Sequence, residues 1–357
     1  MSEHARVDNA TPIASEDRRE TGDAGSPPTT PTTKRRFLKG IPLEYRKAAA
    51  VMAIALIMTS AFAAAYTVAL GRPVPRRLPV GVIGPTSITA PVIAAMQRGR
   101  HEFDVHTYPS RQAATAAVDH QAITAVIDAT SVPAQLLLSS ASDASAARVL
   151  TERDQTAPGH YLLPIVDLHP LPACDPAGVA TFYVIIAATI LGFVTMFQLR
   201  ANVKTLTLPR WLACVAVLTV VGGACLASVA GPLLGALRAP FPELWLLISA
   251  QIAIAALFNS TMLVLIHRWA IIPTWVVFIL LGNTSSGGAV SASLLPQPFA
   301  FLNHALPSGA AVSAIHTATY FPDNQRVLPF LVLLAWFSVA LVALVVSSRV
   351  LKRSPAE

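Results

Sequence analysis

The chain has 357 residues, of which 54% are hydrophobic and only 13% are charged, and its mean hydropathy is +0.56. Soluble domains carry about 25% charged residues, so this composition excludes an ordinary soluble enzyme. The net charge of +7 does not indicate a nucleic-acid binder, which gathers its basic residues in a patch on a polar surface. We expect a membrane protein that binds membrane lipids and no nucleic acid.

The N-terminal part of the chain is polar and then basic. Residues 1–33 are rich in Glu, Asp, Ser, Thr and Pro, which predicts a disordered cytoplasmic tail. Residues 34–47 mix basic with apolar side chains and predict an interfacial segment at an anionic membrane surface, a solvated basic collar being the alternative. The uncharged run 48–70 is long enough for a first transmembrane helix.

Residues 71–176 have the character of a folded domain outside the membrane. Short apolar runs alternate with helical patterns, which favours a small extracytoplasmic α/β domain with a mostly parallel sheet. The expected strands are 80–84, 103–108, 123–128 and 161–167, and the expected helices are 88–97, 111–120 and 134–150.

Two carboxylate–imidazole pairs occur on expected strands of this domain. Asp104 and His106, like Asp167 and His169, are two residues apart, so each pair would point to one face of the sheet. Surface polar residues are the default interpretation and a metal site is the alternative. We expect no metal site and no cofactor bound by this chain.

The rest of the chain, 177–350, predicts a five-helix membrane domain. The apolar runs 177–199, 211–237, 244–266 and 327–348 are each long enough to cross a bilayer. Another starts at Trp269 and crosses if residues 282–290 complete it. Six spans place most basic residues between spans, and those of the tail 351–357, on the side of the N-terminus, and leave only Arg238 and Arg326 in the short outside segments. We expect a multi-pass plasma-membrane protein with both termini cytoplasmic.

Two amides lie within the run 244–266. Gln251 and Asn259 are eight residues apart, hence on roughly one helix face. They are candidates for a substrate path, and hydrogen bonding to a neighbouring helix is the alternative. Because the expected spans lack Asp, Glu, Lys and Arg in their cores, the sequence disfavours an ion-coupled carrier.

Segment 282–326 is long, nearly uncharged and interrupted by Gly and Pro, unlike a solvated loop. Non-helical backbone at membrane depth is tolerated where protein buries it or where it lines a cavity. The segment therefore predicts a re-entrant outer loop before the last span, formed by a re-entrant or lid-like pair of short helices. The candidate residues of an outer gate are Asn283, Ser285, Ser286, Gly287, Gly288, Pro296, Pro307 and Gly309.

Three stretches carry a family resemblance. Gly-Asn-Thr-Ser-Ser-Gly-Gly-Ala (282–289), Leu-Leu-Pro-Gln-Pro-Phe (294–299) and His-Ala-Leu-Pro-Ser-Gly-Ala (304–310) are similar to the last-span region of ABC-2-type transporter permeases. The order of segments, and the stretches Leu78–Pro85 and Phe103–Ala114, resemble the YhgE/Pip-like branch and its actinobacterial relatives. The long helical insertion that many of that branch carry outside is missing here.

That resemblance implies a half-transporter that forms a homodimer or heterodimer and couples to a separate ATPase, which would bind the ATP. The basic segment 34–47 would match the coupling helix of the family. The residues expected to face the ATPase are Arg200, Lys204, Arg210 and Arg268.

The expected function is a permease subunit of an exporter that moves a hydrophobic or amphipathic substrate, without enzymatic activity of its own. No phosphate-binding loop, nucleophile elbow or His-Glu-x-x-His motif occurs in the sequence. The alternative is a non-transporting receptor or scaffold whose outside domain binds an envelope ligand or partner.

Overall fold

The computed structural model describes residues 42–71, 73–98, 102–156, 163–203 and 205–353. The chain divides into two compact units, residues 1–55 and residues 56–357. Helix α1 (Leu43–Leu70) begins in the first unit, and all other described elements belong to the second. The expected tail 1–33 and most of the basic segment 34–47 lie outside the described residues.

Among the described residues, five strands form one sheet in the order β2-β1-β3-β4-β5. The strands are β1 (Leu78–Ile83), β2 (Phe103–Tyr108), β3 (Ala125–Asp128), β4 (Gln135–Leu138) and β5 (Ile165–Asp167). Only the β3–β4 pair is antiparallel among them. The central strands are apolar and almost entirely buried, as in a sheet covered on both faces. The expected mostly parallel sheet is confirmed.

Three helices connect these strands: α2 (Thr86–Arg98), α3 (Arg111–Asp119) and α4 (Ala144–Thr156). Helix α3 begins after Ser110, whose hydroxyl accepts a hydrogen bond from the backbone N–H of Ala113 at 3.2 Å. Such a cap satisfies one of the free N–H groups of the first turn. The first two helices agree with the expected ranges to within two residues.

The expected helix over 134–150 is wrong in its first part. Gln135–Leu138 is strand β4, and the helix starts only at Ala144. Leucine favours helices in isolation, but Leu136, Leu137 and Leu138 are all buried between β3 and β5. A strand covered on both faces buries successive apolar side chains, and this pairing overrides the helical propensity.

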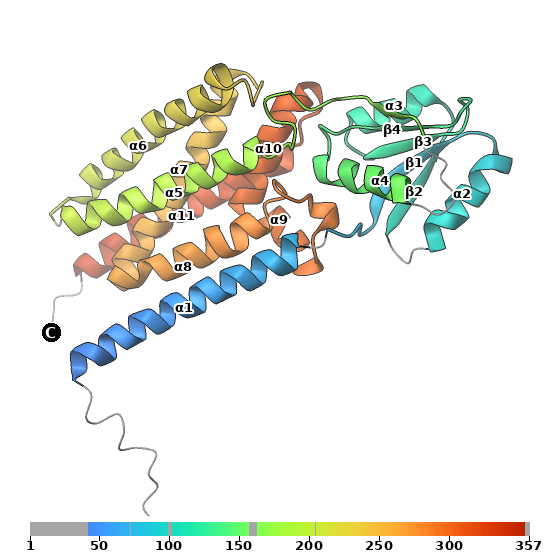
Figure 1. The fold of residues 1–357 in the computed structure, drawn as a ribbon. Coiled ribbons are helices and arrows are strands. Elements are labelled where there is room, and N and C mark those ends of the chain that lie inside the picture. The colour runs from blue at the N-terminus through green and yellow to red at the C-terminus, as the bar shows by residue number, and fades with distance from the viewer. Residues whose placement is uncertain (1–41, 72, 99–101, 157–162, 204, 354–357) are drawn as a thin grey trace, which may run out of the picture. The chain divides into compact units, whose positions relative to one another are not determined.

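Long apolar helices make up most of the remaining chain. In the described residues, five helical runs are long and apolar enough to cross a membrane: Leu43–Leu70, Ala180–Asn202 (α5), Leu208–Leu233, Phe241–Asn283 and Val327–Val350. Helix α7 (Phe241–Ile266) is central, packing against α5, α6 (Leu208–Ser228) and α11 (Val327–Arg353) (Figure 1). At Gly192 of α5 a Cβ would lie 2.6 Å from the carbonyl oxygen of Ile252, so α5 and α7 approach closely there.

Pro232 interrupts the regular hydrogen bonding of the third of these runs, Leu208–Leu233. Helix α6 ends at Ser228 and continues as the π-helical turn η2 (Val229–Leu233), which contains the proline. A proline within a helix removes one backbone hydrogen bond and clashes with the preceding turn, so a local change in helix type is the expected response.

The run Phe241–Asn283 folds back on itself near His267. A straight helix of 43 residues would be about 65 Å long, twice the roughly 30 Å hydrocarbon core. Instead, the Thr274 hydroxyl donates to the Asn259 side-chain oxygen at 3.1 Å, and the rings of Phe258 and Phe278 lie 5.4 Å apart. The backbone of His267 has a φ of 53°, a left-handed conformation that allows this reversal.

The returning arm consists of short helical pieces of different type. They are η3 (His267–Ala270), α8 (Ile271–Trp275) and the π-helix η4 (Val276–Asn283). The arm was expected as the span that begins at Trp269. Its π-helix η4 ends at Asn283, Thr284 is still helical, and residues 285–291 continue as a turn and a non-helical stretch.

Segment 284–326 then contains a pair of short helices, as expected. After η5 (Ala292–Leu294), α9 (Gln297–Ala305) and α10 (Pro307–Tyr320) are joined at Leu306, and η6 (Pro322–Asn324) leads to α11. The Ser308 hydroxyl, at the start of α10, lies 3.4 Å from the Gln251 side-chain nitrogen. Gln251 is about 15 Å along α7 from its first residue. The helix pair therefore enters the bundle deeply.

Candidate functional site

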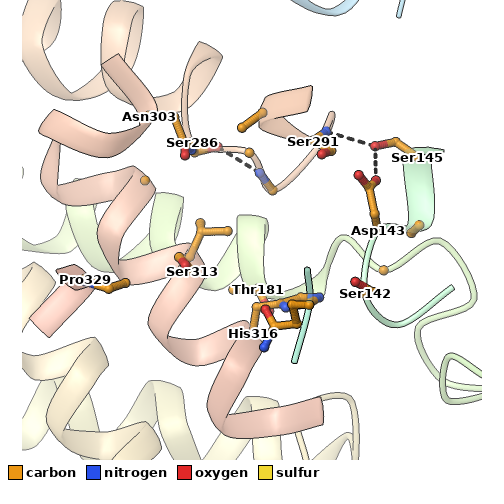
Figure 2. A pocket seen from close by; sticks show the side chains of 18 of the residues that line it. Ser142, Asp143, Ser145, Thr181, Ser286, Ser291, Asn303, Ser313, His316 and Pro329 are labelled. Carbon is orange, nitrogen blue, oxygen red and sulfur yellow. Dashed lines mark hydrogen bonds between the residues drawn. The ribbon is translucent and has the colours of Figure 1, made fainter. Parts of the chain in front are cut away.

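A cavity of about 300 Å³ lies between the α/β domain and the helices that follow. Its walls come from residues 140–145, the beginning of α5, the stretch 286–292, and helix α10 (Figure 2). The polar side chains that line it include Ser142, Asp143, Ser145, Thr181, Ser286, Ser291, Asn303, Ser313, His316 and Arg326. Hydroxyl and amide groups dominate this set, and such groups can fix the orientation of a bound ligand by hydrogen bonds.

Asp143 joins the α/β domain to the stretch before α9. Its carboxylate accepts the backbone N–H of Ala146 at 2.8 Å, so it caps helix α4. It also accepts the hydroxyl of Ser145 at 3.0 Å and that of Ser293 at 3.1 Å (Figure 2 draws the first of these). The Ser145 hydroxyl in turn accepts the backbone N–H of Ser291 at 2.9 Å.

A second set of bonds fixes the same stretch. The backbone N–H of Arg76, just before β1, donates to the Ser293 carbonyl at 2.9 Å, and the Arg76 guanidinium donates to the Leu294 carbonyl. Leu294 and Leu295 are buried in one apolar cluster with Leu78 of β1. The α/β domain and the entrance to α9 are therefore one connected structure.

Burial raises the pKa of Asp143, although the hydroxyl and N–H donors around its carboxylate act in the opposite direction. Protein surrounds this carboxylate even though the residue keeps some surface toward the cavity. Removing this carboxylate would leave the three donors that it accepts from, in Ser145, Ala146 and Ser293, without their acceptor.

The predicted gate residues fall into two groups. Ser286, Gly287, Gly288 and Gly309 line the cavity. Asn283 and Ser285 are buried behind it, and the Asn303 side chain donates to the Ser285 carbonyl at 2.8 Å. Pro296 immediately precedes α9 as its N-cap residue, and Pro307 is the first residue of α10, where proline suits a helix start.

Gln251 and Asn259 are fully buried and bind neighbouring helices. The Gln251 side-chain nitrogen donates to the Thr189 hydroxyl at 2.8 Å, and the Asn259 nitrogen donates to the Phe193 carbonyl at 3.0 Å. Both acceptors belong to α5. Among the described side chains, however, the Gln251 oxygen is buried without a hydrogen-bond partner, as is the Asn283 oxygen.

His316 is a cavity residue that the sequence did not single out. It lies on α10 toward its C-terminal end, outside the spanning helices, and its ring is 5.1 Å from that of Tyr320. Burial lowers the pKa of His316 to about 4; a hydrogen bond to the Ala141 backbone opposes this shift and the charge of Arg326 adds to it. The imidazole is therefore neutral near pH 7.

This neutral histidine predicts acid sensitivity. The folded state has a pKa near 4 and the unfolded state one near 6.5, so the unfolded chain binds the extra proton as pH falls between these values. We expect the wild type to lose on the order of 1 kcal/mol of stability between pH 7 and pH 5. His316→Gln is expected to lack this loss, measured by thermal unfolding in detergent; an identical pH profile for both proteins would contradict the assignment.

Asp143 and Ser145 were missed because the sequence was interpreted as one helix across 134–150. Asp followed by Ala-Ser-Ala-Ala is an N-cap signal, and it marks the true start of α4. His316 has no comparable local signal, because its environment depends on the contact between α10 and the α/β domain.

The residues expected to face an ATPase lie at helix ends and are exposed. Arg200 is in the last turn of α5, Arg210 in the first turn of α6, and Arg268 in the reversal after α7. Lys204 lies outside the described residues. The turn after α5 and the reversal after α7 contribute to a common surface, because Arg200 and His267 line one cavity.

The carboxylate–imidazole pairs make local contacts. His106 lies 3.7 Å from Asp104, and both are about half exposed. His169 lies 3.3 Å from Asp119 and 3.3 Å from the Ser139 hydroxyl. Ser139 is fully buried and accepts the Ser142 N–H, so substrates cannot reach this Ser-His-Asp arrangement. Within the described ranges, no group of three His, Cys, Asp or Glu side chains is placed to hold a metal ion.

Comparison of the chain with protein-family models, with curated proteins and with solved structures gives no match. The functional argument therefore rests on the fold and on the cavity.

Proposed function

We propose that the chain is the membrane permease subunit of an ABC-2-type exporter, which moves a hydrophobic or amphipathic substrate across the plasma membrane with a separate ATPase. The observation that carries this proposal is the helix pair α9–α10, which enters the bundle as far as Gln251 while its outer end forms a polar cavity with the α/β domain. Broken helices at this depth are tolerated where protein buries them or where they line a cavity, and the polar cavity beside α10 supports the second role.

The buried amides support a path through the bundle. The oxygens of Gln251 and Asn283 are buried without partners among the described residues, and an unsatisfied buried acceptor is costly. Ser308 and Gly282 come close together next to Gln251. A substrate or its hydration water passing the start of α10 would satisfy these oxygens. The proposed subunit works as a homodimer or heterodimer.

Six crossings with both termini in the cytoplasm fit the distribution of charge. In this arrangement the two arms of Phe241–Asn283 each cross once, and the basic residues Arg200, Arg210 and Arg268 lie at the cytoplasmic ends. The α/β domain and the cavity then lie outside. We assign Arg210 and Arg268 to the surface of this chain that binds the ATPase.

Cysteine labelling in intact cells tests this topology. In a chain whose Cys214 and Cys225 are replaced by serine, the exposed Cys174 is expected to react with a membrane-impermeant maleimide from outside. Thr205→Cys and Ser354→Cys, each made with Cys174→Ser, are expected to react only after permeabilisation. Labelling of the Ser354→Cys chain in intact cells would mean an odd number of crossings.

Transport itself is tested in inside-out vesicles given ATP and a panel of fluorescent amphipathic probes. Gly287→Val and Gly288→Val together are expected to reduce ATP-dependent uptake at least tenfold while the protein still inserts. A Cβ at Gly287, where φ is 77°, would lie 2.9 Å from the Asn303 amide, and one at Gly288 would lie 2.8 Å from the Phe182 Cβ. Normal uptake by the double variant would remove the gating role.

The alternative function, a receptor or scaffold, is favoured by one feature of the sheet. Strands β2 and β3 lie on opposite sides of β1, so the chain changes direction across the sheet at β1. Ligands of α/β sheets bind at such a topological switch point. There Asp128 is buried and lies 3.5 Å from the Arg111 guanidinium. Burial would raise the pKa of Asp128, but hydrogen bonds from Thr130 and Ser131 and the Arg111 charge outweigh it and lower the pKa.

A further inference from the structure

A second cavity, of about 400 Å³, lies among the ends of four long helices. Arg200 from α5, Trp211 from α6, His267 after α7 and Ser348 from α11 contribute to it. The remaining lining residues are Leu206, Leu208, Ser260, Leu263, Val264 and Leu344. None of the polar cavity residues near the α/β domain takes part, so the two cavities are separate.

The inner wall of this second cavity is apolar. Leu263 and Leu344 are buried and form one cluster with Trp211. The two polar groups at this depth are already paired, because the Trp211 indole N–H donates to the Ser260 hydroxyl at 2.9 Å and that hydroxyl donates to the Ala256 carbonyl. The wall therefore suits hydrocarbon and offers little to a polar ligand.

The rim of the cavity is basic. Arg200 and His267 are the basic side chains among the described residues that line it, and none of those lining residues is acidic. Arg200 is exposed, and its guanidinium presents a fork of N–H donors that matches a phosphate. An anionic group at the rim is thus favoured over a cation or a neutral head group.

The position of Arg200 places the rim at a membrane surface. Helix α5 has 23 residues and is roughly 35 Å long, close to the thickness of a hydrocarbon core, and Arg200 lies in its last turn. A cationic rim above an apolar wall at this level has the polarity profile of a phospholipid. Basic pockets between transmembrane helices bind anionic head groups in this way.

We propose that this cavity binds an anionic phospholipid, with its phosphate on Arg200 and an acyl chain against Leu263 and Leu344. The site does not depend on the transport function or on an ATPase. It assigns Arg200 to lipid binding and leaves Arg210 and Arg268 for the ATPase-facing surface.

Native mass spectrometry of the full chain tests the proposal. The protein is purified in a mild detergent, stripped of lipid, and titrated separately with phosphatidylglycerol and with phosphatidylcholine. We expect one phosphatidylglycerol to bind with at least fivefold preference, since one basic residue near an anionic surface contributes about that factor. Arg200→Gln is expected to abolish the preference.

The matched control removes the same charge beside the cavity. Arg349→Gln changes an exposed arginine next to Ser348 that does not line the cavity, and it is expected to keep the preference. Ser348→Phe keeps the charges but fills the space, and it is expected to weaken phosphatidylglycerol binding at least fivefold. Equal effects of Arg200→Gln and Arg349→Gln, or equal binding of the two lipids, would overturn the site.

Glycerol phosphate distinguishes a lipid from a free phosphate. If the acyl chain contributes as proposed, millimolar glycerol phosphate does not displace the bound lipid. The weak binding of glycerol phosphate itself is then expected to be the same in the Ser348→Phe protein as in the wild type. Glycerol phosphate that binds as tightly as the lipid would overturn the lipid assignment in favour of a soluble phosphate ligand.

Discussion

Replacing Gly309 by alanine is expected to lower the melting temperature of the purified protein by roughly 6–12 °C. A Cβ at this position would lie 2.1 Å from the carbonyl oxygen of Asn303 and 2.9 Å from the carbonyl carbon. Both atoms are backbone, so α9 and α10 must move apart. Overpacking of this kind costs about 3 kcal/mol, and each kcal/mol corresponds to about 2–4 °C in a large domain.

The matched control is Gly231→Ala in η2. A Cβ there would meet no atom closer than 3.5 Å, so a change of less than about 2 °C is expected. Thermal unfolding in detergent measures both variants. Since the Trp336 indole donates to the Ala305 carbonyl at 2.8 Å, the Gly309→Ala protein is also expected to show altered tryptophan fluorescence. Equal melting temperatures for the two variants would mean that α9 and α10 are not joined as described.

Replacing Asp143 by alanine is expected to destabilise the α/β domain by about 3 kcal/mol. The change removes the cap of α4 and leaves the hydroxyls of Ser145 and Ser293 without their acceptor. We expect the domain to melt before the helices, giving two transitions where the wild type has one. Asp104→Ala is the control, because its exposed contact with His106 contributes less than about 0.5 kcal/mol.

Asp143→Asn removes the titratable charge at this position but keeps a side-chain oxygen that can accept hydrogen bonds. Because burial raises the folded-state pKa of Asp143 above the unfolded value of about 3.9, the unfolded chain loses this proton first as pH rises. Wild-type stability is then expected to fall as pH rises through the folded pKa, and the asparagine variant is expected to lack that decline. A single transition in the Asp143→Ala protein, with unchanged melting temperature, would contradict the role of Asp143.

Much of the α/β domain follows from local sequence. Phe103–Tyr108 is a strand with the predicted bounds, and α2 and α3 begin within two residues of the expected positions. Gly84-Pro85 follows the first apolar run and Ser110-Arg111 follows the second, and these local signals predict where a strand ends and a helix begins. Strand β4 does not, because three leucines suit a buried helix and a buried strand equally well, and only the pairing with β3 and β5 decides.

The sequence predicted a turn between two apolar helices near His267, but it did not predict the backbone conformation of that residue. The polar pair His267 and Arg268 divides two apolar runs in the sequence, whereas the left-handed backbone at His267 and the π-helix η4 depend on tertiary packing. In the same way, composition predicted a re-entrant segment over 282–326, but the depth to which α10 enters the helix bundle follows from the contact of Ser308 with Gln251. Long-range hydrogen bonds have no local signature.

The most direct test of the permease function is ATP hydrolysis by the full chain purified in a mild detergent with whatever subunit elutes with it. We predict a stoichiometric partner that contains a phosphate-binding loop, and hydrolysis that rises when an amphipathic substrate is added. Arg210→Gln combined with Arg268→Gln is expected to weaken the complex without changing the fold. A homodimer alone, or a complex with envelope proteins and no hydrolysis, would contradict the permease function and favour the receptor or scaffold.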